Sequence, residues 1–368
     1  MQSGALLYQI ALTRIPQVGA LTARNLISRF GSAEDVFKAH KKDLLAIPGI
    51  GQGTTAEILA PGPLQAAERE LEYIQKNGIQ AIFYTDTRFP VRLKTHRDSP
   101  IILYFKGSDA ALLDQPRMVA VVGTRDISEH GRAICEELVE GLRPYNIVLV
   151  SGLAFGVDVT AHRKATAIGM PNIGVLGHGL GMVYPAQHKA IAERMIENGG
   201  LLTEYAHDTG PDREHFPMRN RIISGLCDAL LVVETATSGG SMISVEFAAK
   251  HNLDIFAVPG RPKDPRSAGC NLLIKNNRAK LVETAEDITE ALNWGLDGLK
   301  KPIQTQLFVD LTSMEQRIVD IVRQQSNIHI DELSAAVDIP SGALATHILQ
   351  LEFKGVLRTH PGKRYTVV

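Results

Sequence analysis

Four short segments rich in glycine and serine stand where buried strands are expected to end. In an open α/β sheet, ligands bind at the carboxyl ends of the strands, and small residues there let backbone N–H groups approach an anion. One such turn also serves helix–strand packing, whereas four at one sheet edge favour a phosphate-type ligand. The segments are Gly123-Thr124-Arg125, Ser151-Gly152-Leu153-Ala154-Phe155-Gly156, Gly177-His178-Gly179-Leu180-Gly181 and Thr237-Ser238-Gly239-Gly240-Ser241.

Basic side chains accompany these segments. Arg125 ends the first one and would place a guanidinium beside the anion, which suits bidentate recognition of phosphate. The run Phe216-Pro217-Met218-Arg219-Asn220-Arg221 combines an aromatic ring with two arginines, a mixture suited to stacking on bases and holding phosphates. The alternative is that these arginines pair with neighbouring carboxylates. Lys189 is a further candidate, with weaker support.

Other chemistries have less support in the sequence. Asp158 and His162 lie four residues apart on one predicted helix with Ser151 nearby, an arrangement that raises nucleophilic catalysis as an alternative. No nucleophile elbow accompanies them, so we interpret the pair as structural. The histidines lack metal-ligand spacing, and neither a dinucleotide-binding glycine motif nor a P-loop is present. The sequence therefore predicts no metal and no cofactor.

The glycine-rich segments fall within a stretch, 79–295, that alternates short apolar runs with helical patterns. Several of the runs, such as 119–122, 147–150 and 229–233, are apolar without alternation, as in strands that helices cover on both faces. Further strands are expected at 81–84, 101–105, 173–176 and 254–258, with helices at 130–142, 157–168, 188–198 and 241–251. This pattern predicts a Rossmann-like, doubly wound α/β fold with a mostly parallel sheet.

Two smaller regions flank this domain. Residues 1–78 contain two similar hairpins, each opening with an Ile-Pro-x-x-Gly turn, and predict a helix-hairpin-helix (SAM-like) domain. Residues 296–311 are predicted to be a linker. Residues 312–368 open on Thr312-Ser313-Met314-Glu315, a capping box, and predict a winged-helix domain. Either flanking region would contact DNA or protein; the third tail helix, 341–350, lacks Lys and Arg, which favours protein.

Composition limits where a polyanion can bind. The 368 residues carry 39 Lys+Arg and 40 Asp+Glu, so the formal charge of −1 excludes a broad basic surface and leaves a local pocket. The three cysteines form no CxxC pair, which fits a reducing compartment. No signal peptide or long apolar run is present, so we expect a cytoplasmic protein with no membrane contact.

Taken together, these motifs resemble those of the DNA-processing protein A (DprA/Smf) family over nearly the whole chain. The most specific stretches are Val121-Val122-Gly123-Thr124-Arg125, 151–162, Tyr184-Pro185, Gly200-Leu201-Leu202-Thr203-Glu204, 219–223 and Val258-Pro259-Gly260. The resemblance implies a homodimer whose Rossmann-like domain binds and protects single-stranded DNA and loads the RecA recombinase during natural transformation. It also implies phosphate contacts at Arg125 and Lys189.

The residues and the resemblance together predict a set of DNA contacts in this chain. They are Gly123, Thr124, Arg125, Ser151, Gly152, Ala154, Lys189, Phe216, Arg219, Asn220, Arg221, Ser238, Gly239, Gly240 and Ser241. The sequence departs from the family at Thr124, where serine is usual, at Gly181, where an aspartate usually follows Gly-Leu, and at Gly239-Gly240-Ser241, which replaces a shorter form.

An enzyme is the alternative function. The middle domain also resembles the cytokinin-activating (LOG-type) phosphoribohydrolases, in which a Gly-Gly-x-Gly-Thr-x-x-Glu segment cradles a nucleotide phosphate. Gly239-Gly240 and Glu246 keep that spacing, but Met242 and Ile243 occupy the Gly-Thr positions. Two bulky apolar side chains would obstruct phosphate contact there, so we favour a DNA-binding protein that is not an enzyme.

Overall fold

A computed structural model describes residues 2–295, 311–325, 328–354, 356–360 and 364–367. The chain forms two compact units, Met1–Gly298 and Leu299–Val368. The predicted linker, apart from residue 311, lies outside the described residues. Within the described ranges, no helix is long and apolar enough to cross a membrane.

The first unit opens with a helical region whose two hairpins follow the repeated turns. Gly19 and Gly51 stand immediately before the second helix of each hairpin, and neither helix has a side-chain cap. Ile15, Ile47 and Ile50 from the two turns are buried in one apolar core with the helices. The helices are α1 (Gln2–Thr13), α2 (Ala20–Phe30), α3 (Ala33–Lys38), α4 (Lys41–Leu45), α5 (Gln52–Leu59) and α6 (Gly62–Lys76).

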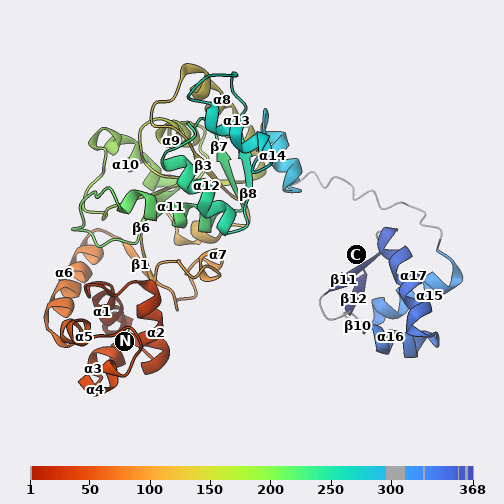
Figure 1. The fold of residues 1–368 in the computed structure, drawn as a ribbon, viewed down its shortest axis with the longest axis horizontal. Coiled ribbons are helices and arrows are strands. Elements are labelled where there is room, and N and C mark those ends of the chain that lie inside the picture. Colours follow the sequence, from red (N-terminus) through yellow and green to blue (C-terminus); the bar gives the residue numbers. More distant parts are fainter. Residues whose placement is uncertain (1, 296–310, 326–327, 355, 361–363, 368) are drawn as a thin grey trace. The chain divides into compact units, whose positions relative to one another are not determined.

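A nine-stranded sheet follows, and most of its neighbouring strands are parallel, as the sequence predicts (Figure 1). The two exceptions are the β1–β2 and β2–β6 pairs, which are antiparallel. The strand order is β1-β2-β6-β5-β4-β3-β7-β8-β9, so the winding direction changes between β3 and β7. The strands are β1 (Gln80–Phe83), β2 (Ile102–Gly107), β3 (Met118–Val122), β4 (Val148–Ser151), β5 (Asn172–Val175), β6 (Gly200–Thr203), β7 (Ala229–Val232), β8 (Asp254–Ala257) and β9 (Lys280–Leu281).

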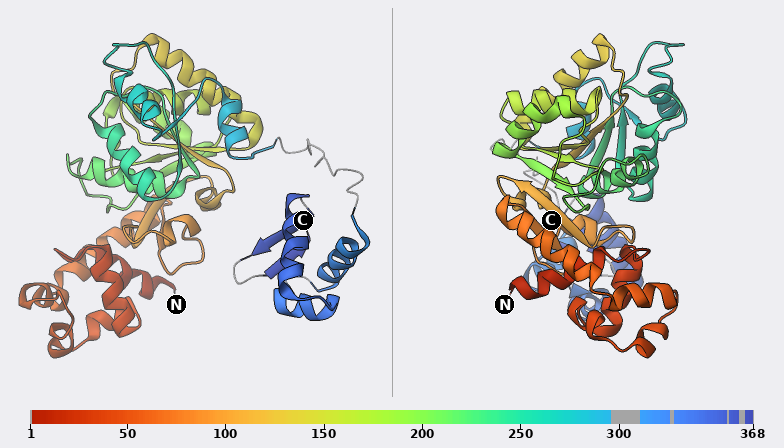
Figure 2. Two further views of the ribbon diagram at one scale, coloured as in Figure 1. Left: turned by 45° about the vertical axis from the view of Figure 1, so that its right-hand side comes forward. Right: turned by 90° about the vertical axis from the view of Figure 1, so that its left-hand side faces the viewer.

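Helices cover both faces of this sheet (Figure 2). Along β3, Val119 and Val121 join the core beneath α8, α9 and α14, whereas Ala120 and Val122 join the core beneath α11, α12 and α13. This two-sided burial explains why these strands read as unbroken apolar runs. The helices are α7 (Val91–Lys94), α8 (Glu129–Leu142), α9 (Val157–Ala167), α10 (Lys189–Asn198), α11 (His215–Leu226), α12 (Gly240–Lys250), α13 (Ala268–Lys275) and α14 (Ala285–Ala291). Three short 3₁₀ turns join them, η1 (Ala110–Asp114), η2 (Arg143–Tyr145) and η3 (Ala186–His188).

The second unit is a winged helix, as predicted. Its described residues form three helices and a small sheet of order β10-β12-β11, whose first strand lies between the first and second of these helices. The predicted capping box is present, since Thr312 N–H donates to Glu315 (2.7 Å) and Glu315 N–H donates to Thr312 Oγ1 (3.3 Å). The elements are α15 (Ser313–Gln324), β10 (Ile328–His329), α16 (Ile330–Val337), α17 (Ser341–Phe353), β11 (Leu357–His360) and β12 (Arg364–Val367).

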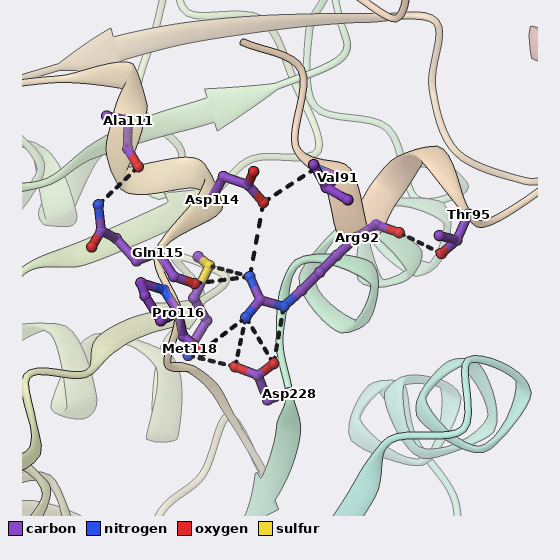
Figure 3. Close-up of polar contacts among 9 residues, drawn as sticks. All are labelled: Val91, Arg92, Thr95, Ala111, Asp114, Gln115, Pro116, Met118 and Asp228. Atoms are coloured by element: carbon purple, nitrogen blue, oxygen red, sulfur yellow. Dashed lines mark hydrogen bonds and ion pairs between the residues drawn. The ribbon is translucent and has the colours of Figure 1, made fainter. Parts of the chain in front are cut away.

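One polar network fixes the amino-terminal edge of the sheet (Figure 3). Arg92 on α7 donates to both carboxylate oxygens of Asp228 at 2.8–3.0 Å and to the Gln115 carbonyl at 2.8 Å. The same carboxylate accepts the Met118 N–H at 2.8 Å. Because Asp228 immediately precedes β7 and Met118 begins β3, this network joins the two strands that flank the change of winding direction.

We expect Asp228→Ala to lower the free energy of unfolding of the first unit by about 1–3 kcal/mol, because it removes the carboxylate that accepts from both Arg92 and the Met118 N–H. Asp254→Ala is the matched control, since it removes an exposed Lys280 pair worth at most about 1 kcal/mol. Urea unfolding followed by the fluorescence of the single tryptophan, Trp294, measures both changes in this unit. Equal losses for the two variants would contradict this role of the network.

Candidate nucleic-acid interface

A cavity of about 610 Å³ lies at the carboxyl ends of β3 and β7, the two strands between which the winding direction changes. This is the point in an open α/β sheet where a crevice forms, because the crossover helices leave in opposite directions. We call it the main cavity. It is lined by Val122, Gly123, Thr124, Arg125, Ala154, Asp158, Tyr184, Arg213, Phe216, Pro217, Arg219, Asn220, Ile223, Thr235, Ala236, Ser238, Gly239, Gly240, Ser241 and Ser244.

The N-terminus of α12 forms one wall of the main cavity. Gly239, with φ of 140°, precedes the helix, and no side chain among the described residues caps the first N–H groups. A Cβ added at Gly239 or Gly240 would meet no other atom within 4 Å, so the space beside them is open. A 2.6 Å hydrogen bond between the Thr235 and Ser241 hydroxyls joins the two ends of the loop that precedes α12. Uncapped N–H groups and the helix dipole make this wall a binding surface for an anion.

In the other three glycine-rich segments, the glycines pack closely against neighbouring residues and leave no open space beside them. A Cβ at Gly123 would clash with Val157, and one at Gly152 would clash with the Arg219 guanidinium. The Gly177–Gly181 segment packs against Phe216 and the His207 backbone and lies outside the main cavity. At these glycines the missing side chain lets neighbouring segments pack closely together. Of the glycines in the four segments, only Gly239 and Gly240 leave open space beside the cavity that a ligand can occupy.

Three arginines line the main cavity. Arg125 and Arg213 are exposed, and the Arg125 guanidinium lies 5.9 Å from the centre of the Phe216 ring. Arg219 is only 6% exposed; it donates to the Val175 carbonyl at 2.5 Å, and its Nε has no partner within the described residues. Burial lowers the pKa of Arg219, while nearby Asp158 opposes that shift. An arginine remains protonated at neutral pH, so the floor of the cavity carries positive charge.

Two aromatic side chains, Tyr184 and Phe216, line the main cavity. Tyr184 is exposed, and its ring lies 5.8 Å from that of Phe216. Phe155, beside them, is 45% exposed and meets His188 edge-on at 4.7 Å. Phe155 lines a small neighbouring pocket of about 50 Å³ together with Tyr184 and Phe216. Exposed rings next to guanidinium groups provide stacking surfaces for unpaired bases.

Asp158, His162 and Ser151 do not form a catalytic arrangement. Ser151 Oγ is buried and donates to the Val121 carbonyl at 2.6 Å. The His162 ring nitrogens face the Gly152 carbonyl (2.7 Å) and the Asn172 side chain (2.9 Å). Burial lowers the pKa of His162 despite these two hydrogen bonds. Asp158 instead accepts the Ala154 N–H at 3.2 Å, so these side chains position the β4–α9 loop.

Most of the predicted DNA contacts come together in the main cavity, and four do not. Ser151 and Gly152 lie behind its wall. Arg221 forms an ion pair with Glu204 at 2.6 Å and is 7% exposed. Lys189 is exposed at the start of α10 and lies 3.9 Å from Glu193. A DNA contact by Arg221 would require opening that ion pair, whereas Lys189 remains accessible.

The sequence analysis missed Arg213 and Tyr184 as cavity residues. Arg213 stands three residues before Phe216, and Tyr184 belongs to a dipeptide that the family resemblance already singled out. Extending the 216–221 run by one helical turn toward the N-terminus would have included Arg213. No local pattern places Tyr184 opposite Phe216, because they belong to separate segments.

Glu246 is not placed for the chemistry of the LOG-type enzymes. It lies on the exposed side of α12, forms a 2.8 Å ion pair with Arg278 and does not line the main cavity. Met242, at a position that glycine occupies in those enzymes, packs against the apolar core. The Glu246 carboxylate, which the likeness to these enzymes would place beside a nucleotide, therefore does not line this cavity.

The fold brings together Glu70, His207 and Asp208 where the helical region meets the sheet, a combination that the sequence spacing did not indicate. Their polar atoms bind one another or an arginine: Glu70 accepts from His207 Nδ1 at 2.6 Å, and Asp208 accepts twice from Arg14 at 3.1 Å. The Tyr73 ring stacks on His207 at 3.9 Å. These contacts join α6 and α1 to the loop after β6.

Three family models match this chain. The model described as DNA recombination-mediator protein A matches residues 80–293, a SAM-like helix-hairpin-helix tandem matches 10–60, and a DprA winged helix domain matches 305–363. Among curated relatives, Protein Smf of Escherichia coli is 32% identical over 308 residues, covering 82% of this chain and 80% of its own. The DNA processing protein DprA of Bacillus subtilis is 36% identical over 224 residues, covering 61% of this chain and 75% of its own.

Solved structures agree with these relatives. DNA processing protein A of Streptococcus pneumoniae superposes with a TM-score of 0.64 at 30% identity, covering 77% of this chain and 97% of the other. The same protein from Helicobacter pylori, whose structure is described as giving its single-stranded DNA binding mode, superposes with a TM-score of 0.53 at 28% identity, covering 58% and 95%. Since the first family model spans more than half of the residues, this chain belongs to the DNA recombination-mediator protein A family.

Proposed function

We propose that this protein binds single-stranded DNA in the main cavity, acts as a homodimer in the cytoplasm, and loads a RecA-type recombinase onto the bound strand during natural transformation. The observation that carries the proposal is the uncapped N-terminus of α12, which shares one cavity with Arg125, Arg213 and Arg219. The family description as a recombination mediator and the single-stranded DNA binding described for the Helicobacter pylori relative support it.

The cavity favours a single strand over a duplex. The arginines and the α12 N–H groups lie beside the exposed ring of Tyr184 and the half-buried ring of Phe216. A single strand that enters the cavity can therefore place its phosphates on the first groups and stack its bases on the rings. In a duplex, the bases are paired and stacked inward and do not reach such rings. The formal charge of −1 leaves no broad basic surface to hold a duplex through its phosphates alone.

Few phosphates fit near three arginines, so one protomer is expected to bind weakly. Joining two cavities in a dimer raises the apparent affinity, because the second site binds a strand that the first already holds. This argument supports the homodimer. It also supports a protecting role, since each cavity would cover a short stretch of strand.

We expect Arg125→Ala to weaken binding of fluorescent oligo-dT by about 10- to 100-fold, the loss of one charge-assisted contact. The slope of log affinity against log salt should become shallower by about 0.7, the value for one phosphate on a single strand. Fluorescence anisotropy at several salt concentrations measures both quantities. Arg143→Ala, at an exposed arginine outside the cavity lining, is the control. Wild-type affinity and slope in Arg125→Ala would refute the pocket assignment.

We expect Gly240→Asp to abolish binding of oligo-dT without lowering the stability of the fold. The new side chain has open space and stands at the first residue of α12, where a carboxylate stabilises a helix. There it would occupy and repel the position of a phosphate. Gly240→Ala is the control, because it adds a side chain at the same position without a negative charge. It should retain most of the affinity for oligo-dT. Tight binding by Gly240→Asp would show that the α12 N-terminus does not hold DNA.

The loading step is tested separately. On single-stranded DNA covered with a single-strand binding protein, the wild-type chain should increase the rate of DNA-dependent ATP hydrolysis by RecA, and Gly240→Asp should not. A wild-type chain that binds DNA but leaves this rate unchanged would contradict the mediator role and preserve the binding role.

A further inference from the structure

A second cavity, of about 340 Å³, lies beside the main cavity, between α8 and α9. We call it the α8–α9 cavity. Helix α8 contributes Arg132, α9 contributes Thr160 and Arg163, and the 3₁₀ turn before α10 contributes Gln187. The glycine-rich segments of the sequence analysis reach this cavity only at Arg125 and at Phe155-Gly156. Its other basic residues, Arg132 and Arg163, lie on helices that carry no glycine-rich or aromatic-basic motif.

The charge of the α8–α9 cavity is positive. Arg125, Arg132 and Arg163 all line it and are all exposed. Within the described residues, neither Arg132 nor Arg163 forms an ion pair, and Arg132 contacts only the Thr160 hydroxyl, at 3.4 Å. The single carboxylate in the lining, Asp126, already pairs with Arg266 at 2.8 Å. Exposed guanidinium groups that no carboxylate neutralises are suited to phosphate.

The α8–α9 cavity continues from the main cavity. Arg125 lines both of them, so one guanidinium faces both spaces. The small 50 Å³ pocket lies between them: it shares Tyr184 and Phe216 with the main cavity and Phe155 with the α8–α9 cavity. The half-exposed Phe155 ring therefore stands on the route from one cavity to the other.

We propose that the α8–α9 cavity is a second segment of the nucleic-acid path, in which Arg132 and Arg163 hold phosphates of a single strand that leaves the main cavity over Arg125 and Phe155. The inference rests on the proposed function, since it concerns a strand already held in the main cavity. The path of exposed cations and rings explains how a chain with a formal charge of −1 holds more than the nucleotides that one cavity contains.

The test uses oligo-dT of increasing length with the full chain. A short oligomer fills the main cavity alone, and a longer one also reaches the α8–α9 cavity. For Arg132→Ala/Arg163→Ala, we expect unchanged affinity for the short oligomers and at least about a tenfold loss for the long ones, from two lost charge-assisted contacts. The salt slope for long oligomers should become shallower by about 1.4, which corresponds to two phosphates.

Two further variants make the comparison specific. Arg29→Ala/Arg143→Ala removes the same charge at exposed positions outside all three cavity linings and should behave as wild type. Arg132→Lys/Arg163→Lys keeps the charge and should restore most of the salt slope. Trp294 fluorescence during urea unfolding verifies that each variant is folded.

The outcomes separate this inference from the proposed function. If the wild-type chain binds no oligo-dT, the proposed function fails and the inference fails with it. If the wild-type chain binds but Arg132→Ala/Arg163→Ala matches it at every length, only the inference is overturned. Equal weakening of short and long oligomers also overturns it, because the two arginines would then act on the main cavity.

Discussion

The burial of Arg219 beneath the main cavity is the constraint on which this site depends. A buried guanidinium is costly unless neighbouring groups compensate its charge, and here the Val175 carbonyl and nearby Asp158 do so. Asp158 in turn accepts the Ala154 N–H, so the ends of β4 and β5 and the start of α9 are arranged around one cation. A Cβ at Gly152 would displace the Arg219 guanidinium and the Asp158 carboxylate from this arrangement.

The same arrangement concentrates positive charge without a basic surface. Lys and Arg are balanced by Asp and Glu over the chain, and many surface cations, such as Lys280 and Arg278, have carboxylate partners. The arginines around the cavities differ because exposed Arg125, Arg132 and Arg163 face open space. Since backbone N–H groups of α12 add partial charge that no residue count records, net charge is a poor guide to this polyanion site.

The success and failure of the sequence predictions have physical causes. The unbroken apolar run of β3 was recognisable because both of its faces are buried. Strand β6 was not among the predicted strands, because it starts with Gly200, whose missing side chain makes room for the Phe105 ring. The Arg219-Asn220-Arg221 motif predicted two equivalent phosphate contacts, but the two arginines occupy different environments on α11: Arg219 reaches the cavity and Arg221 pairs with Glu204.

The sequence alone determined the doubly wound α/β fold, the winged helix and the glycine-rich strand ends, because each depends on residues close together in the chain. Periodicity, capping and turn chemistry act over one or two turns of helix. Only the tertiary structure decided which glycines leave open space, which arginine is paired, and that Arg132 and Arg163 share a cavity with Arg125. Those outcomes depend on contacts between segments far apart in sequence, which no local pattern encodes.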